Sequence, residues 1–162
     1  MKPGEILQHV VEFYGDKARL LRRHEAVARV VGQYDLNNTY QYIIAREDQH
    51  LRWLADAIAA MGGALPPVPP ADPPTAATDP AALQSLARDD ANMLDGFVTA
   101  WRDRVASLTH ARHRLVLELS LGETLEHARL FRQAAGGRLD LLGRRTGGER
   151  TPGVVLPKRW VE

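Results

Sequence analysis

Residues 62–80 read GGALPPVPPADPPTAATDP, and seven of these residues are proline. Proline has no backbone N–H to donate, and its ring clashes with the preceding helical turn, so this stretch forms neither a helix nor an inner strand. On either side of it, residues 4–61 and 81–135 contain no proline. The stretch therefore predicts an extended connector, with polyproline II character, between two long helical segments.

Each helical segment is too long for one globular helix, so we expect each to fold back on itself as a hairpin. In the first segment we place the turn at residues 35–38, with Asn38 as the N-cap of the second helix. A turn at Gly32 is the alternative, and in the second segment Thr109 is the expected cap. The expected helices cover residues 5–34, 39–61, 80–107 and 110–135.

The expected fold is all-α, a bundle of four helices in two antiparallel hairpins joined by a long Pro-rich crossover at residues 62–80. The bundle takes up residues 1–135. Residues 136–162 are rich in glycine and proline and are expected to form an irregular tail. Apolar residues near its end, such as Val154 and Trp160, predict docking on the bundle or on a neighbouring subunit. Bundle faces or this tail are thus the expected contacts of a homo-oligomer.

The composition excludes several classes of function. Formal net charge is +1, from 21 Lys+Arg and 20 Asp+Glu, so the chain has no overall field for nucleic acid or an anionic membrane, and we expect neither partner. The chain has no cysteine, which excludes disulfides and thiolate metal sites. No apolar run reaches the roughly 18–20 residues of a membrane span, and the N-terminus does not resemble a signal peptide. A cytoplasmic location is expected.

Ionisable residues interrupt the apolar stripes of the expected helices, where a charge is costly. The second helix carries Glu47 and His50 on its stripe, the third carries Asp90, and the fourth carries Glu123 and His127. The first helix places His24 and Glu25 on its apolar side. Lys17 lies there too, and we expect its long side chain to snorkel to solvent.

Counting outward from the turns places these groups at common heights. From a turn between residues 36 and 37, Glu47 and His50 face residues 23–26, which include Glu25. From a turn at Thr109, His127 faces residue 91, next to Asp90. Carboxylates and imidazoles together suit iron or manganese, and also zinc. A pair of divalent ions would neutralise four carboxylates in one core, so the predicted metal ligands are Glu25, Glu47, His50, Asp90, Glu123 and His127.

In these residues the chain resembles the ferritin-like di-iron carboxylate family, especially its rubrerythrin-like branch. That family takes a Glu from each of two helices and Glu-x-x-His from each of the other two. Glu47-x-x-His50, within AREDQHLRWLADAI, matches the element of the second helix, and ETLEHARLF resembles that of the fourth. The resemblance implies two Fe or Mn ions acting in Fe(II) oxidation or in O₂ or peroxide chemistry. Rubrerythrin's cysteine-bearing module is missing, so electrons would come from an external donor.

The chain departs from the family pattern in ways that leave alternatives open. Three residues before His127 stands Thr124 instead of Glu. Either a π-bulge brings Glu123 into register with His127, or Glu123-x-x-Glu126 supplies the metal and His127 stands behind it. The third helix offers a shorter Asp, and a turn at Gly32 would bring Tyr14 and Asp16 to the height of the site in place of Glu25. Tyr40 is a candidate for orienting the ligands.

Two other functions remain open. The chain is then either a non-enzymatic scaffold that has lost its metals, or a mononuclear metal protein similar to the DinB-like class, using His24, His50 and His127. Whether the chain is an enzyme is left open with them.

Overall fold

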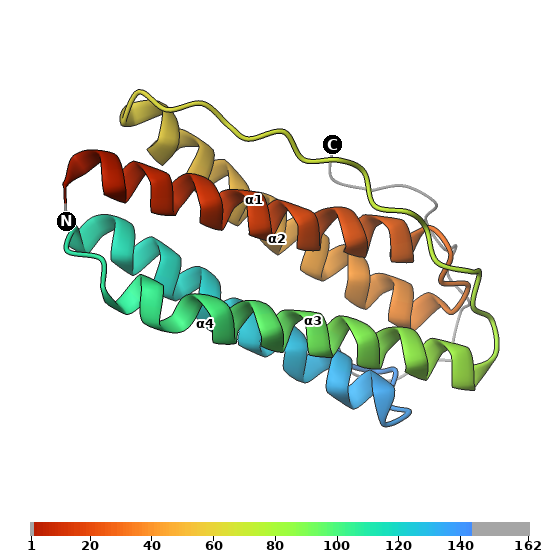
Figure 1. The fold of residues 1–162 in the computed structure, drawn as a ribbon. Helices are drawn as coiled ribbons and strands as arrows, with labels where there is room; N and C mark the ends of the chain where they lie inside the picture. Colours follow the sequence, from red (N-terminus) through yellow and green to blue (C-terminus); the bar gives the residue numbers. More distant parts are fainter. Residues whose placement is uncertain (1, 144–162) are drawn as a thin grey trace.

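The computed structural model describes residues 2–143 and shows four long helices packed as a bundle (Figure 1). They are α1 (Pro3–Ala28), α2 (Tyr34–Ala60), α3 (Pro80–Ala106) and α4 (Ala111–Ala135). Over the described residues the only extended pairing is an isolated bridge between Val31 and Ala77. This confirms the expected all-helical four-helix bundle. No helix in residues 2–143 combines the length and the apolar character that crossing a membrane requires.

Local sequence explains where the second hairpin's helices begin. Asp79 accepts a hydrogen bond from the Ala82 amide at 3.0 Å, and Pro80 follows as the first helical residue. In α4 the cap is His110, whose side chain accepts from the His113 amide. Thr109 is therefore not the cap, although the helix begins only one residue later than expected.

The turn of the first hairpin was predicted in the wrong place. It spans residues 29–33, so α1 ends at Ala28 and α2 begins at Tyr34. Gln33 caps α2 by accepting from the Leu36 amide, and the Asn37 side chain donates 2.8 Å to the Ala28 carbonyl at the end of α1. Asn37 thus ties two helices together from inside α2. The Gly32 alternative is the correct one.

Residues 61–79 connect α2 to α3 and run along the bundle, from the end of α2 to the opposite end where α3 begins (Figure 1). Glycine allows the chain to turn there: Gly62 has a φ of +75°, and a Cβ on Gly63 would lie 2.6 Å from the Leu7 side chain. At the far end, Ala77 pairs with the first turn through its amide, which donates 3.3 Å to the Val30 carbonyl.

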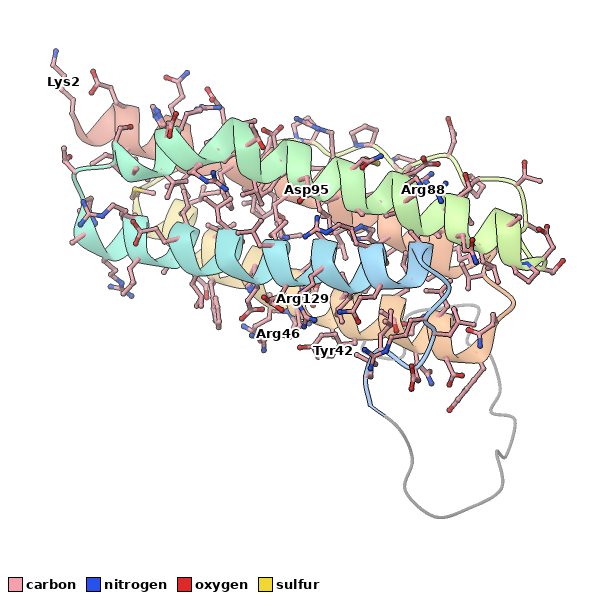
Figure 2. All side chains as sticks on the ribbon, turned by 90° about the horizontal axis from the view of Figure 1, so that it is seen from below. Lys2, Tyr42, Arg46, Arg88, Asp95 and Arg129 are labelled. Atoms are coloured by element: carbon pink, nitrogen blue, oxygen red, sulfur yellow. The ribbon has the colours of Figure 1, made fainter. Side chains whose placement is uncertain are left out.

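Side chains fill the space between the helices along the whole bundle (Figure 2). Toward one end the core is aromatic, with Phe13 meeting Phe97 and Trp101 edge-on at centroid distances of 5.1 and 5.0 Å. The Trp101 indole donates 2.8 Å to Asp16, which lies at the edge of this core. Residues 144–162, including Val154, Val155, Leu156 and Trp160, lie outside the described residues, as does most of the predicted tail.

Candidate functional site

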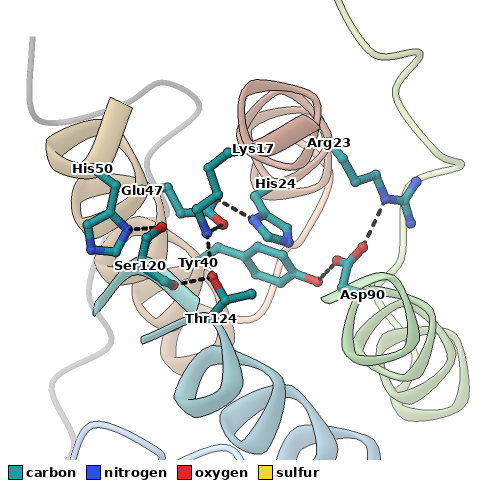
Figure 3. A network of polar contacts seen from close by, with 9 residues as sticks. All are labelled: Lys17, Arg23, His24, Tyr40, Glu47, His50, Asp90, Ser120 and Thr124. Carbon is teal, nitrogen blue, oxygen red and sulfur yellow. Dashed lines mark hydrogen bonds and ion pairs between the residues drawn. The ribbon is translucent and has the colours of Figure 1, made fainter. Parts of the chain in front are cut away.

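Nine polar residues from all four helices meet inside the bundle and are called the polar cluster (Figure 3). They are Lys17, Arg23 and His24 on α1, Tyr40, Glu47 and His50 on α2, Asp90 on α3, and Ser120 and Thr124 on α4. All except Arg23 are buried. The cluster lies between the two hairpins. Five of its members were predicted to lie on apolar stripes as ionisable groups, namely Lys17, His24, Glu47, His50 and Asp90.

Glu47 is the centre of the cluster and is fully buried. One carboxylate oxygen lies 3.1 Å from the Lys17 ammonium, and the other lies 2.7 Å from Nδ1 of His24. Burial raises the pKa of the Glu47 carboxyl, but the charges of His24 and Lys17 outweigh it and hold the pKa well below its ordinary value. Glu47 is therefore an anion inside the core.

Lys17 is also fully buried, so the expectation that it snorkels to solvent is wrong. Besides Glu47, its ammonium donates 2.8 Å to the Thr124 hydroxyl and lies 5.6 Å from the centre of the Phe97 ring. Thr124 donates its own hydroxyl hydrogen 2.7 Å to the Ser120 carbonyl, which leaves its lone pairs free to accept from Lys17. The ammonium is thus held by a carboxylate, a hydroxyl and a ring face.

Asp90 forms a second charged centre on α3. Its two oxygens accept from the Tyr40 hydroxyl at 2.5 Å and from the Arg23 guanidinium at 2.9 Å. Burial raises the pKa of the Tyr40 phenol well above its ordinary value of 10.0, and the Asp90 charge adds to this. Tyr40 therefore stays protonated and serves as a hydrogen-bond donor to a buried carboxylate.

Replacing Tyr40 with phenylalanine should lower the free energy of unfolding by about 1–3 kcal/mol, because Asp90 loses a buried charge-assisted hydrogen bond. Denaturation by urea measures the change. The matched control is Tyr42→Phe, since the Tyr42 side chain is 43% exposed and should cost no more than about 0.5 kcal/mol. Equal effects at the two positions would mean that the bond to Asp90 contributes nothing.

Glu123 lies at the seam between α2 and α4, next to the polar cluster. The Arg46 guanidinium donates two hydrogen bonds to the Glu123 carboxylate, one of them 2.9 Å long. These bonds lower the pKa of the Glu123 carboxyl. Nε2 of His50 lies 3.0 Å from Glu123, although the pair does not have hydrogen-bond geometry. Nδ1 of His50 contacts the Ser120 hydroxyl at 3.5 Å.

The three core histidines differ in protonation. Burial lowers the pKa of His24, but the neighbouring Glu47 raises it more, so the net shift is upward. Burial lowers the pKa of His50, and it lowers that of His127 to about 4, so both rings are neutral near pH 7. In the part of the chain that the structure describes, each of these rings has one buried nitrogen without a hydrogen-bond partner, namely Nε2 of His24, Nε2 of His50 and Nδ1 of His127.

The predicted ligands fall into three groups. Glu47, His50 and Asp90 belong to the polar cluster, while Glu123 and buried His127 lie beside it. Glu25 instead pairs with Arg22 one turn away on α1, at 2.9 Å.

Helical phase explains the arrangement on α4. Its buried stripe runs through Ser120, Thr124 and His127, which leaves Glu123 at the edge of that stripe. The alternative carboxylate, Glu126, is 65% exposed and pairs with Arg129.

No protein-family model, curated protein or solved structure matches this chain. The site is therefore interpreted from its own chemistry. Within residues 2–143, no group of three or more histidine, aspartate or glutamate side chains is arranged so that it could hold a metal ion.

Every predicted carboxylate ligand has a basic partner within the chain. Their contacts are Glu47 with Lys17, Asp90 with Arg23, Glu123 with Arg46, and Glu25 with Arg22. A bridged metal pair needs carboxylates whose charge is left for the ions, and these carboxylates are already neutralised. A metal pair in this site would compete with these basic side chains for the carboxylates. Sequence reasoning did not foresee these partners, because helical periodicity places a residue on a face without showing which side chain it meets.

Proposed function

We propose that this chain is a ferritin-like four-helix bundle whose core works without a metal pair, and that it acts as a non-enzymatic scaffold through its outer surface. The observation that carries the proposal is the buried Lys17 ammonium, which contacts Glu47 at 3.1 Å and Thr124 at 2.8 Å. It supplies the positive charge that the Glu47 carboxylate needs. A core balanced in this way is stable without cations from solution.

The charges of the site support the proposal. Adding two divalent ions would place four further positive charges beside Lys17 and the guanidinium groups of Arg23 and Arg46. Each of these side chains would have to leave its carboxylate, and Lys17 is fully buried in its contact with Glu47. Contacts with a partner would then fall on the outer faces, where α2 and α4 expose large apolar side chains, namely Tyr42, Trp53, Leu115 and Leu119.

Metal analysis of the full chain tests the proposal. Protein purified without chelator, and protein incubated anaerobically with Fe(II) or with Mn(II), should carry no stoichiometric metal, and its thermal midpoint should stay unchanged by EDTA. Binding to the folded state would raise the midpoint by mass action. Two Fe or Mn ions per chain would overturn the proposal and support the di-iron centre, which stays a prediction. The double change of Glu47 and His50 to Ala should then abolish binding.

A second candidate is a single metal ion held by His24, His50 and His127. The observation that favours it is the unpartnered nitrogen on each of these buried rings, since a buried polar atom without a partner calls for an ion or water. The rings would have to turn toward a common ion. One bound Zn(II) or Ni(II) per chain, lost on replacing His127 with Gln, would establish this candidate in place of the scaffold.

A further inference from the structure

The surroundings of the Lys17 ammonium are those of a cation site. Glu47 and Thr124 contribute oxygen atoms at 3.1 and 2.8 Å, and both are fully buried. Imidazoles stand nearby: His24 shares the Glu47 carboxylate, and His127 interacts electrostatically with both Glu47 and Lys17. Each of these two rings has a buried nitrogen without a hydrogen-bond partner. Carboxylate, hydroxyl and imidazole donors are the groups that divalent transition metals take in proteins.

The Lys17 ammonium has one charged contact and one neutral contact. Lys17 brings one positive charge and Glu47 one negative charge, while the other contact, Thr124, is a neutral hydroxyl. The other Glu47 oxygen contacts His24, whose pKa the carboxylate raises, so α4 adds no charge to these contacts. The neutral residue on α4 and the lysine on α1 are thus two parts of one arrangement.

We infer that Lys17 is a built-in substitute for a divalent cation, and that the space around its ammonium is a latent metal site. This inference rests on the proposed function, in which the wild-type core binds no metal pair. Reversing the charge at position 17 should therefore convert the site into one that binds a divalent ion. A Glu side chain is shorter than Lys, so Lys17→Glu leaves room for the ion between the introduced carboxylate and Glu47.

The experiment compares Lys17→Glu with Lys17→Gln, which has the same length and shape but no charge. Full-length proteins are refolded with Mn(II) alone, and bound metal and the thermal midpoint are measured. Lys17→Glu should hold a single Mn(II) per chain, about 100-fold more tightly than Lys17→Gln, and its midpoint should rise with Mn(II) concentration. Adding Glu47→Gln to Lys17→Glu should remove the binding, because one of the two carboxylates is lost.

Three other results would each overturn a claim. If Lys17→Glu folds but holds no Mn(II), or stays unfolded at saturating Mn(II) while Lys17→Gln folds, the latent site does not exist, although the metal-free function of the wild type still stands. Equal Mn(II) binding by both variants would also overturn the inference, because the carboxylate would then be irrelevant. Metal bound stoichiometrically by the wild type, with Lys17 in place, would instead overturn the proposed function.

Discussion

Replacing Lys17 with methionine will lower the free energy of unfolding by about 3–5 kcal/mol, the usual cost of removing one partner from a buried ion pair. Methionine is about as long as lysine and fills the same space, so the effect reports on charge rather than on a cavity. Glu47 is fully buried, and without the ammonium His24 is the one hydrogen-bond partner left to its carboxylate within residues 2–143. The Thr124 hydroxyl loses its donor as well.

Guanidinium denaturation measures this change, and a double-mutant cycle identifies its cause. Glu47→Gln removes the anion, so the double variant with Lys17→Met should be less destabilised than the sum of the two single variants by at least about 1 kcal/mol. Arg19→Met on the same helix is the control, because the Arg19 side chain is 59% exposed and should cost about 0.5 kcal/mol or less. An additive cycle would show that Lys17 does not neutralise Glu47.

Proline placement made the fold predictable. Prolines interrupt the chain only outside the long helical segments, so the number of helices followed from segment length. The predicted ends of α3 and α4 differ from the observed ends by at most one residue, because Pro80 and the glycines after Ala135 mark these ends in the local sequence.

The first turn was less predictable because its decisive bond is not local. Residues 35–38 resemble a turn by composition, but the Asn37 side chain bonds to the Ala28 carbonyl on the other helix, nine residues back. The polar side chains therefore lie inside α2 and hold the hairpin from there. The resulting shift brings Lys17, rather than Glu25, to the height of Glu47.

The stripes predicted most of the buried acids and histidines but not what neutralises them. Glu47, His50, Asp90 and His127 are all buried, as the stripes indicate. The basic partners come from other elements or from long side chains: Arg23 reaches Asp90 across 67 positions of sequence. Apolar periodicity carries no information about such pairs. The position of Lys17 on the apolar side of its helix was a signal in the sequence, because a lysine there is costly unless it is paired.

Acidification from pH 7 to pH 4.5 will destabilise the bundle, and His127 alone should account for about 2 kcal/mol of the loss. Burial lowers the pKa of His127 from 6.5 to about 4. Between pH 6.5 and pH 4 the His127 ring is therefore protonated in the unfolded chain but neutral in the folded protein. Stability therefore falls as the pH drops through this window. His50, whose pKa burial also lowers, acts in the same direction.

Burial also lowers the pKa of His113, so this residue acts in the same direction as His127 and His50. The remaining shifted groups act in another pH range or in the opposite sense. The pKa of His24 is raised, so its contribution to the free energy of unfolding is complete below pH 6.5. That contribution is lost only as the pH rises through the pKa of His24 in the folded protein. The pKa of Glu47 is lowered, so its contribution is present above about pH 4.5 and is lost below that pH. Neither group explains a loss between pH 7 and pH 4.5, so the loss comes from the histidines whose pKa is lowered, with the largest resolved shift at His127.

Urea denaturation of the wild type and of His127→Gln at pH 7 and pH 4.5 separates the His127 contribution from general acid effects. Glutamine stays neutral throughout, so the variant's loss of stability between these pH values should be about 2 kcal/mol smaller than that of the wild type. The comparison uses the slope, which is the change in the free energy of unfolding between the two pH values. Any packing cost of the substitution is the same at both pH values and therefore does not affect this slope. His110→Gln, at the exposed start of α4, should keep the wild-type slope. An unchanged slope in His127→Gln would show that the His127 ring already carries its proton in the folded core.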